Sequence, residues 1–201
     1  IEHAAGGSGA NTMIGIAQLG GHSAFTGKIG FDPRGDQYRN DLEDKGVKAA
    51  LGAGEGMTGS SLILVSNDGS RTMNTHLGMC QELEPDDIDE KVLSSTNILY
   101  LTGFLWDTES QKASVRHALE MVENLSVKVA LSLSDPFCVE RHHQDFNELI
   151  RSRVDLLFCN QEEAFAMMET QVTQEALAGL SENVETVVMT LGTRGSLICN
   201  Q

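Results

Sequence analysis

A glycine-rich loop that runs directly into an apolar helical pattern is the first segment of this chain that could do chemistry. It reads Gly6-Gly7-Ser8-Gly9-Ala10-Asn11-Thr12, and apolar residues follow at helical spacing between Met13 and Leu19. Glycines let the backbone approach a ligand closely, and a helix N-terminus offers free N–H groups and a partial positive charge. The amide of Asn11 can hydrogen-bond to adjacent hydroxyls. The loop predicts a binding site for a small polar molecule; an ordinary glycine-rich turn is the alternative interpretation.

The loop differs from the better-known phosphate-binding glycine motifs. No lysine follows the glycines, as a P-loop requires, and Thr12 stands where the dinucleotide fingerprint has its third glycine. No preceding strand is visible between residue 1 and the loop. Dinucleotide binding is therefore disfavoured.

The second half of the chain alternates short apolar runs with amphipathic segments, which indicates a parallel sheet covered by helices, an α/β fold. The expected strands are 98–101, 127–133, 154–158 and 187–189, and the expected helices are one around 115–122, one over about 139–151, and two over 161–169 and 173–181. In the first half, an Asp-Gly turn between two strand-like runs predicts a hairpin over residues 60–75. This hairpin is expected either as part of a small second sheet over a site or at the edge of the main sheet.

Open parallel sheets bind ligands beyond the carboxyl ends of their strands. Polar residues and glycines cluster there, at Gly103, 135–136, 160–163 and 190–195. Taken singly, these positions have plainer interpretations, because Asn160 with Glu163 can form a helix-capping box and Gly192 and Gly195 can serve turns.

Taken together, three motifs resemble the ribokinase-like (PfkB) sugar and nucleoside kinases over essentially the whole chain. They are Gly6-Gly7-x-x-x-Asn11, Asn160-x-x-Glu163 and Thr190-x-Gly192-x-x-Gly195, in that order. The intermediate stretches 71–78, 103–107 and 131–139 look closest to the bacterial adenosine-kinase-like branch. The resemblance implies an open, mostly parallel sheet sandwiched by helices, with a small β lid to which the 60–75 hairpin would belong.

The resemblance also implies roles for the motif residues. Gly6, Gly7 and Asn11 would hold sugar or ribose hydroxyls, and Thr190, Gly192 and Gly195 would line the nucleotide pocket. Asn160 and Glu163 would organise Mg²⁺ and its waters near the phosphates of ATP. Two family elements are absent from the 201 residues: the N-terminal strand with a substrate-binding aspartate, and the glycine-rich segment that carries the catalytic base. We therefore expect residues 1–201 to be an incomplete kinase domain without phosphotransfer activity of its own.

Composition restricts the partners. The formal net charge is −15, which argues against nucleic acid or an anionic membrane, because both require a basic face.

Four widely spaced cysteines, without a Cys-x-x-Cys pair or a zinc-ligand pattern, predict buried free thiols in a reducing cytoplasm. His142 and His143 are adjacent and are interpreted as surface histidines rather than a metal pair. No apolar run approaches the ~20 residues of a membrane span, and no signal peptide is visible.

The expected activity of the full-length protein is ATP-dependent phosphorylation of a primary hydroxyl on a nucleoside, adenosine above all, or on a sugar. Phe104 and Trp106 could stack on a nucleobase, although both rings could equally pack in the core. A ribokinase- or fructokinase-type sugar kinase, a pseudokinase and a non-catalytic nucleotide- or sugar-binding protein are the alternatives. A homodimer formed through the lid is the expected assembly.

Overall fold

The computed structural model describes residues 3–201, which form two compact units. Unit 1 comprises the chain up to Leu93 together with Thr108–Glu120, and unit 2 comprises Ser94–Asp107 together with Met121–Gln201. Residues 1 and 2, the start of the domain expected from the sequence, lie outside the described residues. Each unit is described by itself.

Unit 1 is built around a pair of parallel strands with two helices. In chain order its first elements are α1 (Ser8–Gln18), β1 (Ser23–Gly30), α2 (Pro33–Asp44) and β2 (Val47–Gly54). Strands β1 and β2 pair in parallel from Ser23 opposite Val47 to Gly30 opposite Gly54. The core of this part combines the apolar face of α1 with residues of α2 and β2, namely Ala10, Ile14, Leu42 and Val47. These interactions fix the start of α1, where the glycine-rich loop lies.

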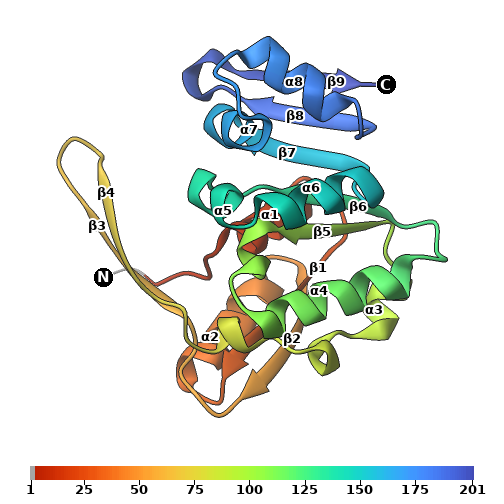
Figure 1. Cartoon of the computed structure of the whole chain (residues 1–201). Helices are drawn as coiled ribbons and strands as arrows, with labels where there is room; N and C mark the ends of the chain where they lie inside the picture. The colour runs from red at the N-terminus through yellow and green to blue at the C-terminus, as the bar shows by residue number, and fades with distance from the viewer. Residues whose placement is uncertain (1–2) are drawn as a thin grey trace. The chain divides into compact units, whose positions relative to one another are not determined.

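The predicted hairpin is present in unit 1. Strand β3 (Ser60–Val65) pairs antiparallel with β4 (Arg71–His76), and Gly69 in the turn has a φ of 83°. An Asp-Gly turn suits this connection because glycine adopts positive φ without steric cost. Figure 1 draws the hairpin as a two-stranded ribbon, and it forms a sheet of its own rather than an edge of the main sheet. Short helical segments follow it, at η1 (Gly78–Glu82), η2 (Pro85–Asp87) and α3 (Glu90–Ser94).

Unit 2 contains a five-stranded sheet in the order β5-β6-β7-β8-β9. Its strands are β5 (Ile98–Thr102), β6 (Lys128–Ser132), β7 (Leu156–Asn160), β8 (Thr186–Thr190) and β9 (Ser196–Asn200). Strands β5 to β8 run parallel, and β9 returns antiparallel to β8. The consecutive buried residues Val129, Ala130 and Leu131 in β6 are typical of a strand buried on both faces. The expected mostly parallel α/β sheet is therefore confirmed.

Helices connect these strands. They are η3 (Gly103–Trp106), α4 (Glu109–Val122), α5 (Pro136–Arg141), α6 (His143–Ser152), α7 (Gln161–Met168), α8 (Thr173–Ser181) and η4 (Gly192–Arg194). Helix α4 begins in unit 1 and ends in unit 2. Its buried residues Val115, Ala118, Leu119 and Val122 form the face that the periodicity predicts.

The prediction of a single helix over 139–151 is wrong, because the structure has two helices there. Helix α5 begins earlier, at Pro136, where the Asp135 side chain caps it by accepting the Cys138 N–H at 2.9 Å. The helix ends at His142, whose φ of −120° is outside the helical range, and α6 begins at the next residue. Because the break is a backbone feature without proline or glycine, the apolar periodicity does not reveal it. Among residues 3–201, no helix combines the length and the apolar content that a membrane span needs.

Candidate functional site

The N-terminus of α1 in unit 1 is open to a ligand. Gly7 is the N-cap, with a φ of 101° that a residue with a side chain rarely adopts, and no side chain caps the helix. The space where Cβ atoms would lie at Gly6 and Gly7 is empty to 4 Å. The exposed Asn11 side chain has no hydrogen-bond partner among the described residues. Free helix N–H groups beside an unpaired amide can bind a polyhydroxy ligand, as the sequence predicts.

Side chains of α2 hold this loop in place. The Tyr38 hydroxyl donates to the Gly6 carbonyl at 3.1 Å, and the Ala5 N–H donates to the Asp41 carboxylate at 3.0 Å. Burial raises the pKa of Tyr38 well above its usual value, so its hydroxyl stays protonated as a donor. The loop is thereby supported by two long-range bonds.

Asn160 and Glu163 lie at the carboxyl end of β7 in unit 2 and bind each other reciprocally. The Asn160 side-chain oxygen accepts the Glu163 N–H at 2.8 Å, and the Glu163 carboxylate accepts the Asn160 backbone N–H at 2.9 Å. The Asn160 amide also donates to the other carboxylate oxygen at 2.6 Å. This is a complete capping box for α7. The structural interpretation of the motif is therefore confirmed, and its role at a metal remains a prediction.

The residue Glu163 is only 5% exposed. Burial raises its pKa above the usual value, although the hydrogen bond from the Asn160 N–H acts in the opposite direction. Both carboxylate oxygens already accept hydrogen bonds from Asn160, and the side chain is buried, which disfavours an ion bound directly to it. Oxygen donors suit Mg²⁺, which keeps several of its waters. The pair therefore fits an Mg²⁺ ion held through water better than direct coordination.

Thr190 lies beside Asn160, because β7 and β8 pair in register with Asn160 opposite Thr190. The chain then turns tightly through η4. Gly192 has a φ of 62° and Gly195 one of 89°, and the Leu191 N–H donates to the Gly195 carbonyl at 2.8 Å. The space at the missing Cβ positions of both glycines is open. The predicted nucleotide-pocket residues and the Asn160–Glu163 pair thus share one edge of the sheet.

A side-chain bond that the sequence analysis did not identify joins these two segments. The Arg194 guanidinium donates to the Gln161 side-chain oxygen at 2.5 Å. Both residues lie within the predicted motifs, at positions where any residue is allowed, so the motifs gave no signal for them. The bond ties the η4 turn to the start of α7. By contrast, Gly6, Gly7 and Asn11 belong to unit 1 and the other predicted site residues to unit 2.

The two aromatic residues after β5 differ in their surroundings. Trp106 is 7% exposed and packs edge-to-face against Phe146, with ring centroids 5.1 Å apart. It is therefore a core residue rather than an open stacking surface. Phe104 is 40% exposed and stays available to a planar ligand.

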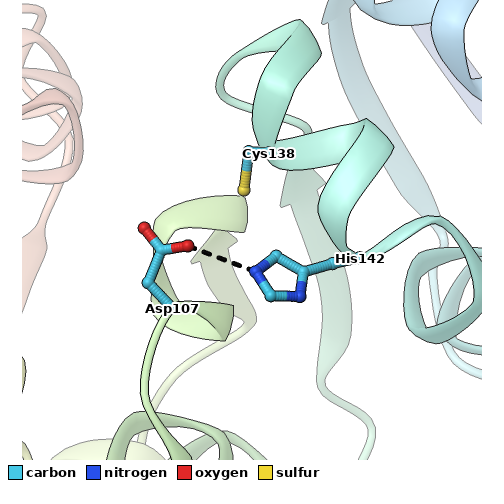
Figure 2. Close-up of side chains that lie close together, drawn as sticks. All are labelled: Asp107, Cys138 and His142. Atoms are coloured by element: carbon cyan, nitrogen blue, oxygen red, sulfur yellow. Dashed lines mark hydrogen bonds and ion pairs between the residues drawn. The ribbon is translucent and has the colours of Figure 1, made fainter.

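A cluster of Asp107, Cys138 and His142 lies at the junction of η3 and α5 (Figure 2). The Asp107 carboxylate accepts a hydrogen bond from Arg141 at 2.9 Å and lies 3.2 Å from the His142 Nε2. Burial opposes ionisation of Asp107, but these two partners outweigh it and hold the pKa of Asp107 below its usual value. Cys138 is fully buried, and burial raises the pKa of its thiol to about 11.

The interpretation of both histidines as surface residues is wrong, because each is half-buried and bonded. His142 faces Asp107, whereas the Nε2 of His143 contacts the Met167 carbonyl at 2.9 Å. The two rings do point to different partners, so the prediction that they do not form a metal pair with each other is consistent with the geometry. All four cysteines are free thiols, as expected. Only Cys138 and Cys159 are buried, whereas Cys80 and Cys199 are half-exposed.

The sequence profile of the pfkB family of carbohydrate kinases matches residues 1–201, and the chain belongs to that family. The chain is 37% identical to an adenosine kinase from Sinorhizobium meliloti, with a TM-score of 0.91 over 97% of this chain and 61% of that one. It is 34% identical to a probable sugar kinase from Rhizobium etli, with a TM-score of 0.93 over 98% of this chain and 61% of that one.

Among curated relatives, an ATP-dependent ribose-1-phosphate kinase from Halopiger xanaduensis is 29% identical over 83% of this chain and 53% of its own length. Mouse ribokinase is 24% identical over 98% of this chain and 60% of its own length. The chain therefore spans about half to three-fifths of these relatives. The ribokinase-like fold expected from the motifs is confirmed by the structural likeness.

Proposed function

We propose that the full-length protein transfers the γ-phosphoryl group of ATP to a primary hydroxyl of a purine nucleoside such as adenosine. The observation that carries this proposal is the shared sheet edge, where the Asn160–Glu163 pair lies in register with Thr190. Membership of the pfkB family and 37% identity to an adenosine kinase support the reaction class and the nucleoside.

In this proposal each group of residues has a distinct role. The N-terminus of α1, with Gly6, Gly7 and Asn11, binds the ribose hydroxyls. Thr190, Gly192 and Gly195 line the pocket of ATP, and the open space at both glycines leaves room for it. Asn160 and Glu163 orient waters around Mg²⁺, which when bound neutralises charge on the phosphates. No residue of the 201 is proposed as the base.

A sugar kinase is the second candidate. It is favoured by the 34% identity to a probable sugar kinase and by the ribose-1-phosphate kinase among the curated relatives. The nucleoside is preferred because the half-exposed Phe104 ring at the end of β5 offers an apolar surface that a free sugar does not need.

The proposed assembly is a homodimer formed through the hairpin. Strands β3 and β4 expose Leu62, Ile63, Leu64, Val65 and Met73. Exposed apolar strands favour burial against another surface. Sedimentation of the full-length wild type and of the variant Ile63→Ser with Leu64→Ser tests this. A variant with the same mass in solution as the wild type would contradict the dimer.

The proposed location is the cytoplasm, where the four free thiols stay reduced.

The reaction is tested by ³¹P NMR of the full-length protein with ATP, Mg²⁺ and adenosine. The expected result is a new phosphomonoester, together with ADP. 5′-Deoxyadenosine keeps the base and the ring hydroxyls but lacks the primary hydroxyl, so it should yield no ester. Binding of both ligands without any transfer would instead support a non-catalytic binding protein.

A further inference from the structure

We propose that Asp107, Cys138 and His142 form a binding site for Zn²⁺, distinct from the magnesium site proposed at Asn160 and Glu163. One carboxylate oxygen, the thiol sulfur and a ring nitrogen all lie within 4.8 Å of one another. Figure 2 shows the three side chains converging from two segments of the chain. A shift of the side chains by about an ångström would bring the three atoms to the ~2.0–2.3 Å metal–ligand distances of a zinc site.

The local fold places these ligands. Cys138 lies in the first turn of α5, and His142, four residues later, is the C-cap of that helix and donates its N–H to the Cys138 carbonyl at 3.0 Å. Residues four apart on a helix are neighbours on one face, so both side chains lie on the same side. Asp107 is the C-cap of η3. Aromatic packing supports them from behind, because Phe146 contacts both the Trp106 ring, at 5.1 Å between centroids, and the His142 ring, at 6.1 Å. The three donors are therefore largely preorganised.

The kinds of donor select the metal. Thiolate and imidazole are the usual ligands of zinc, and a carboxylate often completes such a set. Mg²⁺ and Ca²⁺ prefer oxygen ligands throughout, so a buried sulfur disfavours both. Three protein ligands leave one tetrahedral position for water or another small ligand.

Arg141 is the obvious competitor of the metal. Its guanidinium contacts the same Asp107 oxygen that faces His142, and among the described residues the other carboxylate oxygen has no hydrogen-bond partner. The Arg141 side chain is about half exposed, so it can turn into solvent at little cost. When the metal binds, the Cys138 sulfur exchanges its proton for the ion, and that proton passes to solvent. Charge then balances with one thiolate and one carboxylate around a divalent ion.

The test titrates the metal-free full-length protein with Zn²⁺ and, separately, with Co²⁺ as a spectroscopic substitute. One ion per chain is expected, and the Co²⁺ form should show a thiolate-to-cobalt charge-transfer band and the visible bands of a tetrahedral site. His142→Gln and Asp107→Asn should each weaken Zn²⁺ binding on the order of 10–100-fold or more. Cys138→Ser should abolish the charge-transfer band.

Matched controls separate this site from other thiols and imidazoles. Cys199→Ser and His143→Gln change a cysteine and a histidine of the same unit outside the cluster, and they should bind Zn²⁺ like the wild type. If Cys138→Ser does not fold, the Zn²⁺ affinities of His142→Gln and Asp107→Asn still test the site. Circular dichroism checks that these two variants are folded. Zn²⁺ should raise the melting temperature of the wild type but not of His142→Gln.

The proposal would be overturned if Zn²⁺ bound equally well to His142→Gln and Asp107→Asn, if the Co²⁺ form lacked the charge-transfer band, or if neither ion bound. Because these measurements need no ATP or nucleoside, their outcome is independent of the proposed kinase reaction.

Discussion

The Glu163 carboxylate accepts hydrogen bonds from both the backbone and the side-chain N–H groups of Asn160, at 2.9 and 2.6 Å. The same two residues therefore start helix α7 and present oxygen atoms at the carboxyl edge of the sheet. A substitution in this pair can affect folding and catalysis together. Measuring both the free energy of unfolding and the turnover of the variants separates the two effects.

Glu163→Gln should lower the turnover of the full-length protein about 10- to 100-fold, because a group acting on a metal through water is expected to matter by that factor. The Mg²⁺ concentration needed for half-maximal rate should rise. Steady-state rates across an Mg²⁺ series measure both. Glu162→Gln changes the exposed neighbouring carboxylate and should behave like the wild type. Wild-type Mg²⁺ dependence in Glu163→Gln would refute the role.

Asn160→Ala should also destabilise the fold, by about 1 kcal/mol, because it removes the N-cap of α7. Urea unfolding measures this loss. If Asn160→Ala lowered activity without changing the free energy of unfolding, the capping role of Asn160 would be contradicted.

Asn11→Ala should raise the KM for the phosphoryl acceptor, because substrate hydroxyls would lose their partner in the pocket. The expected loss is about 1–3 kcal/mol of binding. Initial rates at saturating ATP measure it. Thr12→Ala is the matched control, since the Thr12 hydroxyl donates to the Ser8 carbonyl within α1. An unchanged KM in Asn11→Ala would count against the α1 site.

Phe104→Ala should reduce kcat/KM for adenosine more than for ribose, because only the nucleoside has a base to stack. Parallel assays with the two acceptors give the ratio. Leu125→Ala, which removes a comparably exposed apolar side chain from the turn before β6, should leave that ratio unchanged. An equal loss of kcat/KM for both acceptors would show that Phe104 does not stack on the base.

Asp32→Asn should lower stability at neutral pH, and this deficit should be smaller at pH 3. Asp32 accepts hydrogen bonds from the Thr58 hydroxyl at 2.7 Å, the Thr58 N–H at 2.8 Å and the Gly35 N–H at 2.8 Å. These bonds, first the one from the Thr58 hydroxyl, hold the pKa of Asp32 below its usual value.

The sign follows from that direction. A lowered pKa in the folded state stabilises the protein above the unfolded pKa of about 3.9, and this gain is lost as pH falls through the folded pKa. Urea unfolding at pH 7 and pH 3 tests it, with Asp36→Asn in the same helix as the control. An equal deficit for Asp32→Asn at both pH values would contradict the mechanism.

The sequence predicted the second half of the fold well, because β6, β7 and β8 are short apolar runs with helices between them. It also placed Asn160 and Thr190 at one sheet edge, since parallel strands end on the same side. Strands β1 and β2 were not predicted. Their residues are mostly half-buried and mix glycine, lysine and threonine with apolar residues, so neither a continuous apolar run nor clean alternation marks them.

Contacts between distant segments could not be predicted either. Asp107 and His142 are 35 positions apart, and nothing in their local sequences indicates that they meet. Trp106 follows a strand end just as Phe104 does, yet only the tertiary packing against Phe146 decides that its ring is buried.

The most direct test of the proposed reaction is a competition in one tube. The full-length protein is given ATP, Mg²⁺ and equal concentrations of adenosine and ribose, and the two phosphorylated products are quantified at low conversion. Their ratio equals the ratio of the two kcat/KM values. The nucleoside monophosphate should predominate. Predominance of ribose phosphate, or the absence of both products, would contradict it.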